Sequence, residues 1–143
     1  RYYWKSEYLS GVEPALCGKI IEHAAKIRSP HSAVILFQIG GALNRLENEH
    51  SPVGNRNARH VLNIPGSWEQ AAEDTANVKW VREAWNDMKS FSTGGTYINF
   101  LTEEEGSERT AAALGTGLQR LAEIKAQWDP QNMFRSNRNI KPA

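Results

Sequence analysis

Apolar residues in this chain follow two different repeats, and the order of these repeats limits the folds that it can adopt. Between residues 12 and 27 they recur every three or four positions, which predicts an amphipathic helix over 12–28. Residues 32–38 instead form a continuous apolar run of strand length, rich in residues that favour strands. The sequence therefore predicts a domain that contains both helices and strands.

Further segments of both kinds follow along the chain. We expect strands at 1–9, 59–64 and 96–101, with 59–64 in the centre of the sheet, and helices at 78–91 and 107–128. The last helix should break at Gly115-Thr116-Gly117, because each interior glycine costs about 0.5–1 kcal/mol relative to alanine. Strands joined by short connections favour an antiparallel sheet. We therefore expect an α+β fold with helices packed on one face of the sheet, plus a C-terminal helix and an irregular tail.

Local signals indicate where these elements begin and end. Ser10 and Glu13 have the spacing of a capping box at the start of the first helix. Pro65-Gly66 should end the central strand. Gly40-Gly41 suggests a bulge or a close approach to the backbone, and residues 42–46 should continue the preceding strand or pair back on it.

Composition excludes several classes of protein. The 143 residues carry a formal net charge of +1, which argues against a nucleic-acid-binding protein and against a polybasic membrane anchor. No run of about 18 apolar residues could span a membrane, and no signal peptide is visible, so we expect a cytoplasmic location. The single cysteine, Cys17, excludes an internal disulfide and is interpreted as a small core residue.

Local motifs nominate no chemistry by themselves. The four histidines lack the spacing of a metal site, and no Gly-x-Ser-x-Gly sequence marks a nucleophile. Gly115-Thr116-Gly117 lies within a helical region rather than after a strand, so it does not indicate dinucleotide binding. The residues alone thus indicate only an α+β domain.

Short motifs in the last third of the chain carry a family resemblance. They are Tyr97-Ile98-Asn99-Phe100, then Arg120-Leu121 with Ile124-Lys125, then Asp129-Pro130-Gln131-Asn132-Met133-Phe134, and finally Asn139-Ile140-Lys141-Pro142. In this order and at this spacing they resemble the C-terminal part of the berberine bridge enzyme-like FAD-linked oxidoreductases of bacterial type. These proteins form part of the vanillyl-alcohol oxidase/PCMH-type flavoprotein superfamily.

The resemblance implies a division of the chain and a cofactor. Residues 1–95 would form the C-terminal half of a substrate domain, and residues 96–143 would return to an FAD-binding domain that this chain does not contain. FAD would be bound mainly by that missing domain, which is the expected partner of this chain. The whole protein would be an FAD-linked oxidase or dehydrogenase acting on a small molecule, and the fragment alone would be inactive.

The resemblance also assigns site residues. It implies that Tyr97, Asn99 and Asn137 contact the cofactor, and that Gln38, Gly40, Asn63 and Phe100 contact the substrate. Phe100 occupies the position where many relatives carry a tyrosine base, and phenylalanine cannot transfer a proton. His60 is a weak alternative base, for which a structural role is the simpler interpretation. Packing within a strand is the corresponding simpler interpretation of Tyr97 and Asn99.

A second hypothesis needs no flavin. An antiparallel sheet with helices on one face leaves the other face open, and that face could bury against a second copy of the chain. The chain would then be a non-enzymatic α+β dimerisation module or a small-molecule binding module. A homodimer is compatible with both hypotheses.

Overall fold

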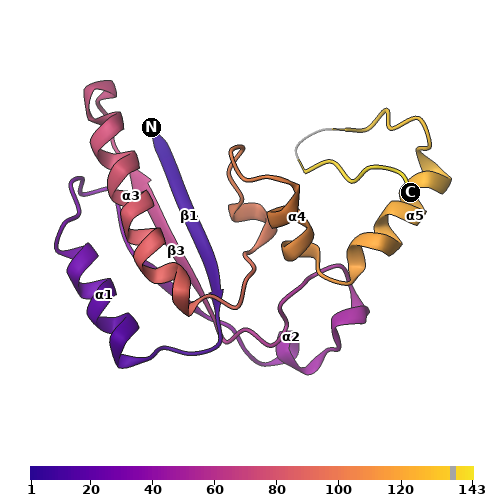
Figure 1. Cartoon of the computed structure of the whole chain (residues 1–143), viewed down its shortest axis with the longest axis horizontal. Helices are drawn as coiled ribbons and strands as arrows, with labels where there is room; N and C mark the ends of the chain where they lie inside the picture. Colours follow the sequence, from indigo (N-terminus) through magenta and orange to yellow (C-terminus); the bar gives the residue numbers. More distant parts are fainter. Residues whose placement is uncertain (136–137) are drawn as a thin grey trace.

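The computed structural model describes residues 1–135 and 138–143 and has an α+β fold (Figure 1). Its antiparallel sheet has the order β1-β3-β2, with strands β1 (Tyr2–Leu9), β2 (Ile35–Gln38) and β3 (His60–Ser67). The helices are α1 (Pro14–Ala24), α2 (Ala42–Arg45), α3 (Asp74–Met88), α4 (Ser107–Leu114) and α5 (Gly117–Trp128). The expected fold class, and the central position of the strand near 59–64, are confirmed.

The strand register divides the sheet into two faces. β1 pairs with β3 along its whole length, and the shorter β2 pairs with the first half of β3. Alternate residues of a strand point to opposite sides. One face, the helix face, therefore carries Leu9, Leu62 and Ile64, which pack with side chains of α1 and α3. The opposite face, which we name the open face, carries Trp4, Ser6, Tyr8, Val61, Asn63, Ile35 and Phe37.

Two helices cover the helix face. Figure 1 shows α1 and α3 side by side over the sheet, while α4 and α5 lie beyond the outer edge of β1. The core between sheet and helices includes Leu16 of α1 and Val81, Ala84 and Met88 of α3. None of the helices within residues 1–135 and 138–143 has the length and apolar character needed to cross a membrane.

The break between α4 and α5 falls where the glycines predict it. Gly115 has φ 57°, a left-handed conformation that glycine adopts at low cost. A Cβ atom on Gly115 would lie 3.1 Å from the Cα of Gly54, so the site also needs a residue without a side chain. The Gly54 amide donates to the Ala113 carbonyl at 3.0 Å, which joins α4 to the loop after α2.

Residues 96–101 do not form the expected strand. Ile98–Phe100 form a short 3-10 turn, closed by a hydrogen bond from the Phe100 amide to the Tyr97 carbonyl at 2.8 Å. Pairing with the outer edge of β1 stops at Gly95, whose carbonyl accepts from the Tyr8 amide at 2.8 Å. The next outward carbonyl of β1, that of Ser6, accepts instead from the Arg109 side chain at 3.0 Å. A side chain therefore occupies the hydrogen-bonding position that a continued strand would need.

Three local expectations are also wrong. Residues 42–46 contain helix α2 rather than an extension of the strand. Glu13 is the N-cap of α1 without a side-chain cap bond, so no capping box forms. Pro65-Gly66 does not end β3, which continues to Ser67. The Pro65 carbonyl accepts a hydrogen bond from the Ala33 amide at 3.1 Å, on the β2 side of the strand and beyond the last β2–β3 pair. The missing N–H of Pro65 points to that side as well, so it costs no ladder bond.

The burial of Ile64 in the central strand gives a test of this core. Replacing it, as Ile64→Ala, should lower the free energy of unfolding by about 2–5 kcal/mol, because a cavity forms and buried contacts are lost. The matched change Ile21→Ala, at a position that is 69% exposed, should change it by less than about 0.5 kcal/mol. Urea unfolding followed by circular dichroism measures both. Equal losses would contradict the described core.

Candidate functional site

The open face of the sheet is lined mainly by aromatic and apolar side chains. Trp4 and Tyr8 of β1 and Phe37 of β2 point to this side, as the register requires. Phe100 packs against the cluster of Tyr8, Ala58 and Val61, and its ring centroid lies 6.3 Å from that of Phe37. The turn at 98–100 is therefore seated on the open face.

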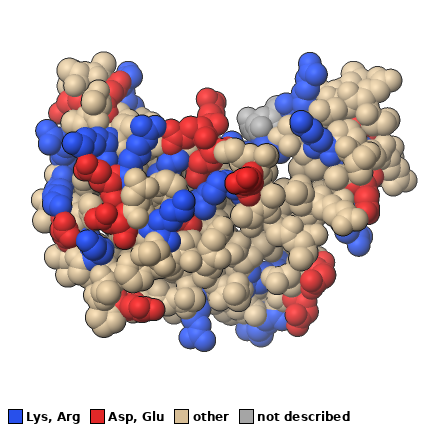
Figure 2. Space-filling view, viewed as in Figure 1, with Lys and Arg blue, Asp and Glu red and all other residues tan. Residues whose placement is uncertain are grey.

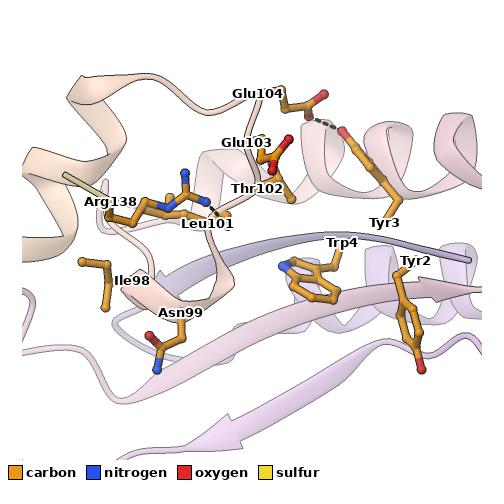
Figure 3. Close-up of a pocket in the computed structure, with 10 residues that line it drawn as sticks. All are labelled: Tyr2, Tyr3, Trp4, Ile98, Asn99, Leu101, Thr102, Glu103, Glu104 and Arg138. Carbon is orange, nitrogen blue, oxygen red and sulfur yellow. Dashed lines mark hydrogen bonds between the residues drawn. The ribbon is translucent and has the colours of Figure 1, made fainter. Parts of the chain in front are cut away.

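Trp4 fixes the backbone of this turn. Its indole Nε1 donates a hydrogen bond to the Phe100 carbonyl at 2.9 Å. Figure 3 shows Trp4 and Asn99 on one side of β1, and Tyr3 with Glu104 on the other. Trp4, Asn99 and Arg138 line a broad cavity of about 1010 Å³ at this edge of the sheet. The turn thus presents Asn99 to a space large enough for a ligand.

Tyr97 and Asn99 form an exposed polar pair. The Asn99 amide nitrogen donates to the Tyr97 hydroxyl at 2.7 Å, and the Tyr97 ring meets Phe100 edge-on at 5.3 Å. This arrangement leaves the Tyr97 hydroxyl proton as a donor and the Asn99 carbonyl oxygen as an acceptor. A flavin edge presents alternating carbonyl and N–H groups, so the chemistry of this pair fits a flavin.

Two buried polar side chains of the open face lack hydrogen-bond partners within residues 1–135 and 138–143. Ser6 and Asn63 are paired across β1 and β3, and only 1% and 8% of their surfaces are exposed. The Ser6 hydroxyl and the Asn63 side-chain carbonyl have no partner there. Unpaired buried polar atoms are costly, which makes them candidates for contacts to a polar group of a ligand.

The sheet separates the remaining residues that the sequence nominates. Asn63 and Phe100 lie on the open face, whereas Gln38 and His60 form a cross-strand pair whose side chains point to the helix face. Gly40 is exposed just after β2. Asn137 lies outside the described residues. The structure therefore brings together Asn63, Phe100, Tyr97 and Asn99, and it leaves Gln38 and His60 on the other side.

Tyr8 is a site residue that the sequence motifs do not nominate. Burial raises the pKa of its phenol, and the nearby Tyr97 adds to the rise. Tyr8 is therefore a protonated hydrogen-bond donor at neutral pH rather than a base. Alternation along 2–9 is the signal that could have placed it beside Trp4 and Ser6 on one face.

A buried ionic network lies on the helix face, behind the turn. Lys5 of β1 contacts Glu104 at 2.6 Å and donates to the Thr102 hydroxyl at 3.2 Å. Glu7, two residues further, accepts from the Trp85 indole at 2.7 Å and pairs with Arg109 at 2.9 Å. Figure 2 shows that charges of both signs gather over α1 and α3. The network connects β1 and α3 to the segment that follows the turn.

The network shifts the ionisation of two of its members. Burial acts to raise the pKa of Glu104, but hydrogen bonds from Lys5, Tyr3 and Arg82 outweigh it and lower the pKa to about 2. Burial, together with the hydrogen bond to Glu104, raises the pKa of Tyr3 to about 12. Glu104 is thus charged and Tyr3 protonated across the physiological range.

Known proteins share sequence with this chain. A family model described as "Berberine and berberine like" matches residues 96–141. The aclacinomycin-N/aclacinomycin-A oxidase of Streptomyces galilaeus is 25% identical over 126 residues, which cover 76% of this chain and 23% of that protein. The FAD-linked oxidoreductase YgaK of Bacillus subtilis is 27% identical over 122 residues, covering 85% of this chain and 26% of that protein.

Solved structures share its fold. The berberine bridge enzyme from Eschscholzia californica has a TM-score of 0.87 at 19% identity, over 99% of this chain and 33% of that chain. The chain thus spans between 23% and 33% of the length of these relatives. The chain is thus similar in sequence to FAD-linked oxidoreductases, and it shares its fold with solved structures of this kind. Within that class, the resemblance to the berberine bridge enzyme-like proteins, indicated by the motifs of the tail, is confirmed.

The burial of Lys5 leads to a stability prediction. The variant Lys5→Met should lower the free energy of unfolding by about 1.5–3 kcal/mol, because it removes the buried ammonium that contacts Glu104 and Glu105, while Arg82 and Arg109 still pair with these carboxylates. Lys79→Met removes a lysine from the exposed Lys79–Glu83 pair and should cost less than about 1 kcal/mol. Chemical denaturation of both variants gives the comparison. Similar small losses would show that the network does not hold the segment.

The low pKa of Glu104 predicts a pH dependence. A folded-state pKa of about 2, below the ordinary 4.5, means that ionised Glu104 stabilises the fold above pH 4.5. This contribution is lost as the pH falls from 4.5 towards 2. The difference in thermal stability between wild type and Glu104→Gln should therefore shrink over this window. Glu103→Gln, at an exposed neighbouring position, is the control. A difference that stays constant across the window would refute the assignment.

Proposed function

We propose that this chain supplies a substrate-facing sheet and a flavin-side turn to an FAD-dependent oxidoreductase that transfers a hydride from a small-molecule substrate to FAD. The observation that carries the proposal is the exposed Tyr97–Asn99 pair, held on a turn above the open face. Relatives described as FAD-linked oxidoreductases and oxidases support the same class of reaction.

Bound FAD would accept the hydride. Tyr97 would donate from its hydroxyl to a carbonyl oxygen of the flavin edge. The side-chain carbonyl of Asn99 would accept from an N–H group of the flavin. Their mutual hydrogen bond at 2.7 Å orients both groups before the flavin binds. Such preorganisation is effective because no rearrangement is needed when charge builds up on the flavin.

The open face would bind the substrate beside that turn. Phe100 and Phe37 supply an apolar wall, and Asn63 supplies a buried amide beneath it. Phe100 shapes the pocket and cannot take a proton. The position of His60 on the helix face does not support a role as base, because the sheet lies between it and Phe100.

We also propose that residues 1–95 form the later half of a substrate domain and that 96–143 contact a separate FAD-binding domain of the same polypeptide. Exposed apolar side chains near the end of the chain support such a contact. They are Trp128, Met133 and Phe134, each of which is more than two-thirds exposed. FAD would be held mainly by that other domain, so this chain alone would be inactive.

Variants of the polar pair test this function in the complete flavoprotein. Asn99→Ala and Tyr97→Phe should each weaken FAD binding up to about tenfold, since one hydrogen bond is worth about 1 kcal/mol. They should also lower the flavin midpoint potential, because a donor to the electron-rich reduced flavin is lost or misplaced. Absorbance gives the flavin-to-protein ratio, and potentiometric titration gives the potential. The control Asn86→Ala, exposed on α3, should change neither. Wild-type flavin content and potential in both pair variants would rule the proposal out.

A further inference from the structure

Trp4 makes the hydrogen bond by which the sheet holds the backbone of the flavin-side turn. Its indole Nε1 donates to the Phe100 carbonyl at 2.9 Å across 96 positions of sequence. The indole is itself steadied by the Tyr2 ring, which meets it edge-on with centroids 6.2 Å apart. Trp4 belongs to β1, which pairs with β3 along its whole length, so the position of the turn depends on that pairing.

The internal bonds of the turn fix its shape but not its place. The Phe100 amide donates to the Tyr97 carbonyl at 2.8 Å, and the Asn99 amide donates to the Tyr97 hydroxyl at 2.7 Å. Both bonds stay within residues 97–100, so they do not attach the turn to the sheet, and a single turn released from the sheet would open more often. Placement therefore depends on contacts outside the turn. They include the Trp4 bond, the packing of Phe100 on Tyr8 and Phe37, and the Arg138 side chain, which donates to the Leu101 carbonyl.

The next residue of β1 holds the other end of the same segment. Lys5 points to the opposite face and binds Thr102 and Glu104 there. The chain from 100 to 104 thus crosses the outer edge of β1 between two consecutive side chains, Trp4 and Lys5. Because both ends of the crossing are held, a change at Trp4 should move the turn without releasing the rest of the segment.

We propose that Trp4 is a positioning residue for the cofactor: its hydrogen bond to the Phe100 carbonyl sets where Tyr97 and Asn99 meet the flavin edge, and thereby adjusts the flavin's reduction potential. This inference rests on the proposed function. Trp4 does not need to touch the flavin, since it acts through the backbone of the turn.

The test compares two tryptophans in the complete flavoprotein. Trp4→Phe removes the indole donor, and Trp4→benzothienylalanine, introduced by codon suppression, removes it while keeping the bulk of the side chain. The matched control is Trp80→Phe, because the Trp80 indole also donates to a backbone carbonyl, that of His23 at 3.0 Å, but in the helix-face core. Trp80→Phe should lower the melting temperature without changing the midpoint potential of the flavin.

Two measurements are made on each variant. Hydrogen–deuterium exchange reports the Phe100 and Leu101 amides, which are bonded within the turn. Potentiometric titration gives the midpoint potential of the flavin. Both Trp4 variants should speed exchange at these amides. They should also change the ratio of oxidised to reduced flavin at fixed potential about threefold to tenfold, which corresponds to a midpoint potential lowered by about 15–30 mV for a two-electron couple.

The outcomes separate this inference from the function on which it rests. Faster exchange with an unchanged potential would overturn it, because the turn would then not reach the flavin. A shifted potential with unchanged exchange would also overturn it, because Trp4 would then act directly. If Asn99→Ala shifts the potential and the Trp4 variants do not, the function stands and the role of Trp4 fails. If none of them shifts it, the proposed function fails as well.

Discussion

Two opposite charges, Lys5 and Glu7, lie on the same face of the edge strand β1 and are almost completely buried. Charges leave water at a cost of several kcal/mol each unless partners surround them. Here the partners come from distant segments: Trp85 from α3, and Glu104, Glu105 and Arg109 from the region after the turn. Loss of the region after the turn would leave Lys5 and Glu7 without these charged partners, and loss of α3 would remove the indole donor to Glu7. The network therefore makes the sheet, α3 and the C-terminal region depend on one another.

The same network explains why β1 ends as an edge. Arg109 takes the Ser6 carbonyl, and the crossing segment covers the outer side of Trp4 and Lys5. An edge strand with free backbone groups is a site for unwanted pairing, and charged side chains directed at it remove that risk. In consequence the segment after Gly95 leaves the sheet and forms the turn at 98–100, and the side chains of Tyr97 and Asn99 are exposed.

How far the sequence predicts this structure depends on whether a feature is local. The helical spacing at 78–91 and the glycines at 115–117 predict α3 and the α4–α5 break correctly, because periodicity and glycine conformation act over a few residues. The segment 96–101 has the composition of a strand, and its turn arises from Trp4 and Arg109, contacts that no local pattern contains. The two faces of β3 could not be predicted locally either. Val61, Leu62 and Ile64 are all apolar, so the sequence shows no alternation, and only the strand register places His60 and Asn63 on opposite faces.

The site residues divide along the same line. Motifs nominate Tyr97, Asn99 and Phe100 because these residues lie within one stretch of four positions. Trp4, Ser6 and Tyr8 join them only through the sheet. The two faces of the sheet then differ in a way that bears on function. On the helix face, Lys5 and Glu7 find their partners within the chain; on the open face, the Ser6 hydroxyl and the Asn63 carbonyl find none among the described residues. The His60 Nδ1 atom on the helix face is also unpaired within residues 1–135 and 138–143, so unmet hydrogen bonds do not by themselves separate the two faces. What separates them is their cover: α1 and α3 pack on the helix face, whereas the aromatic side chains of the open face are contacted by the turn at 98–100.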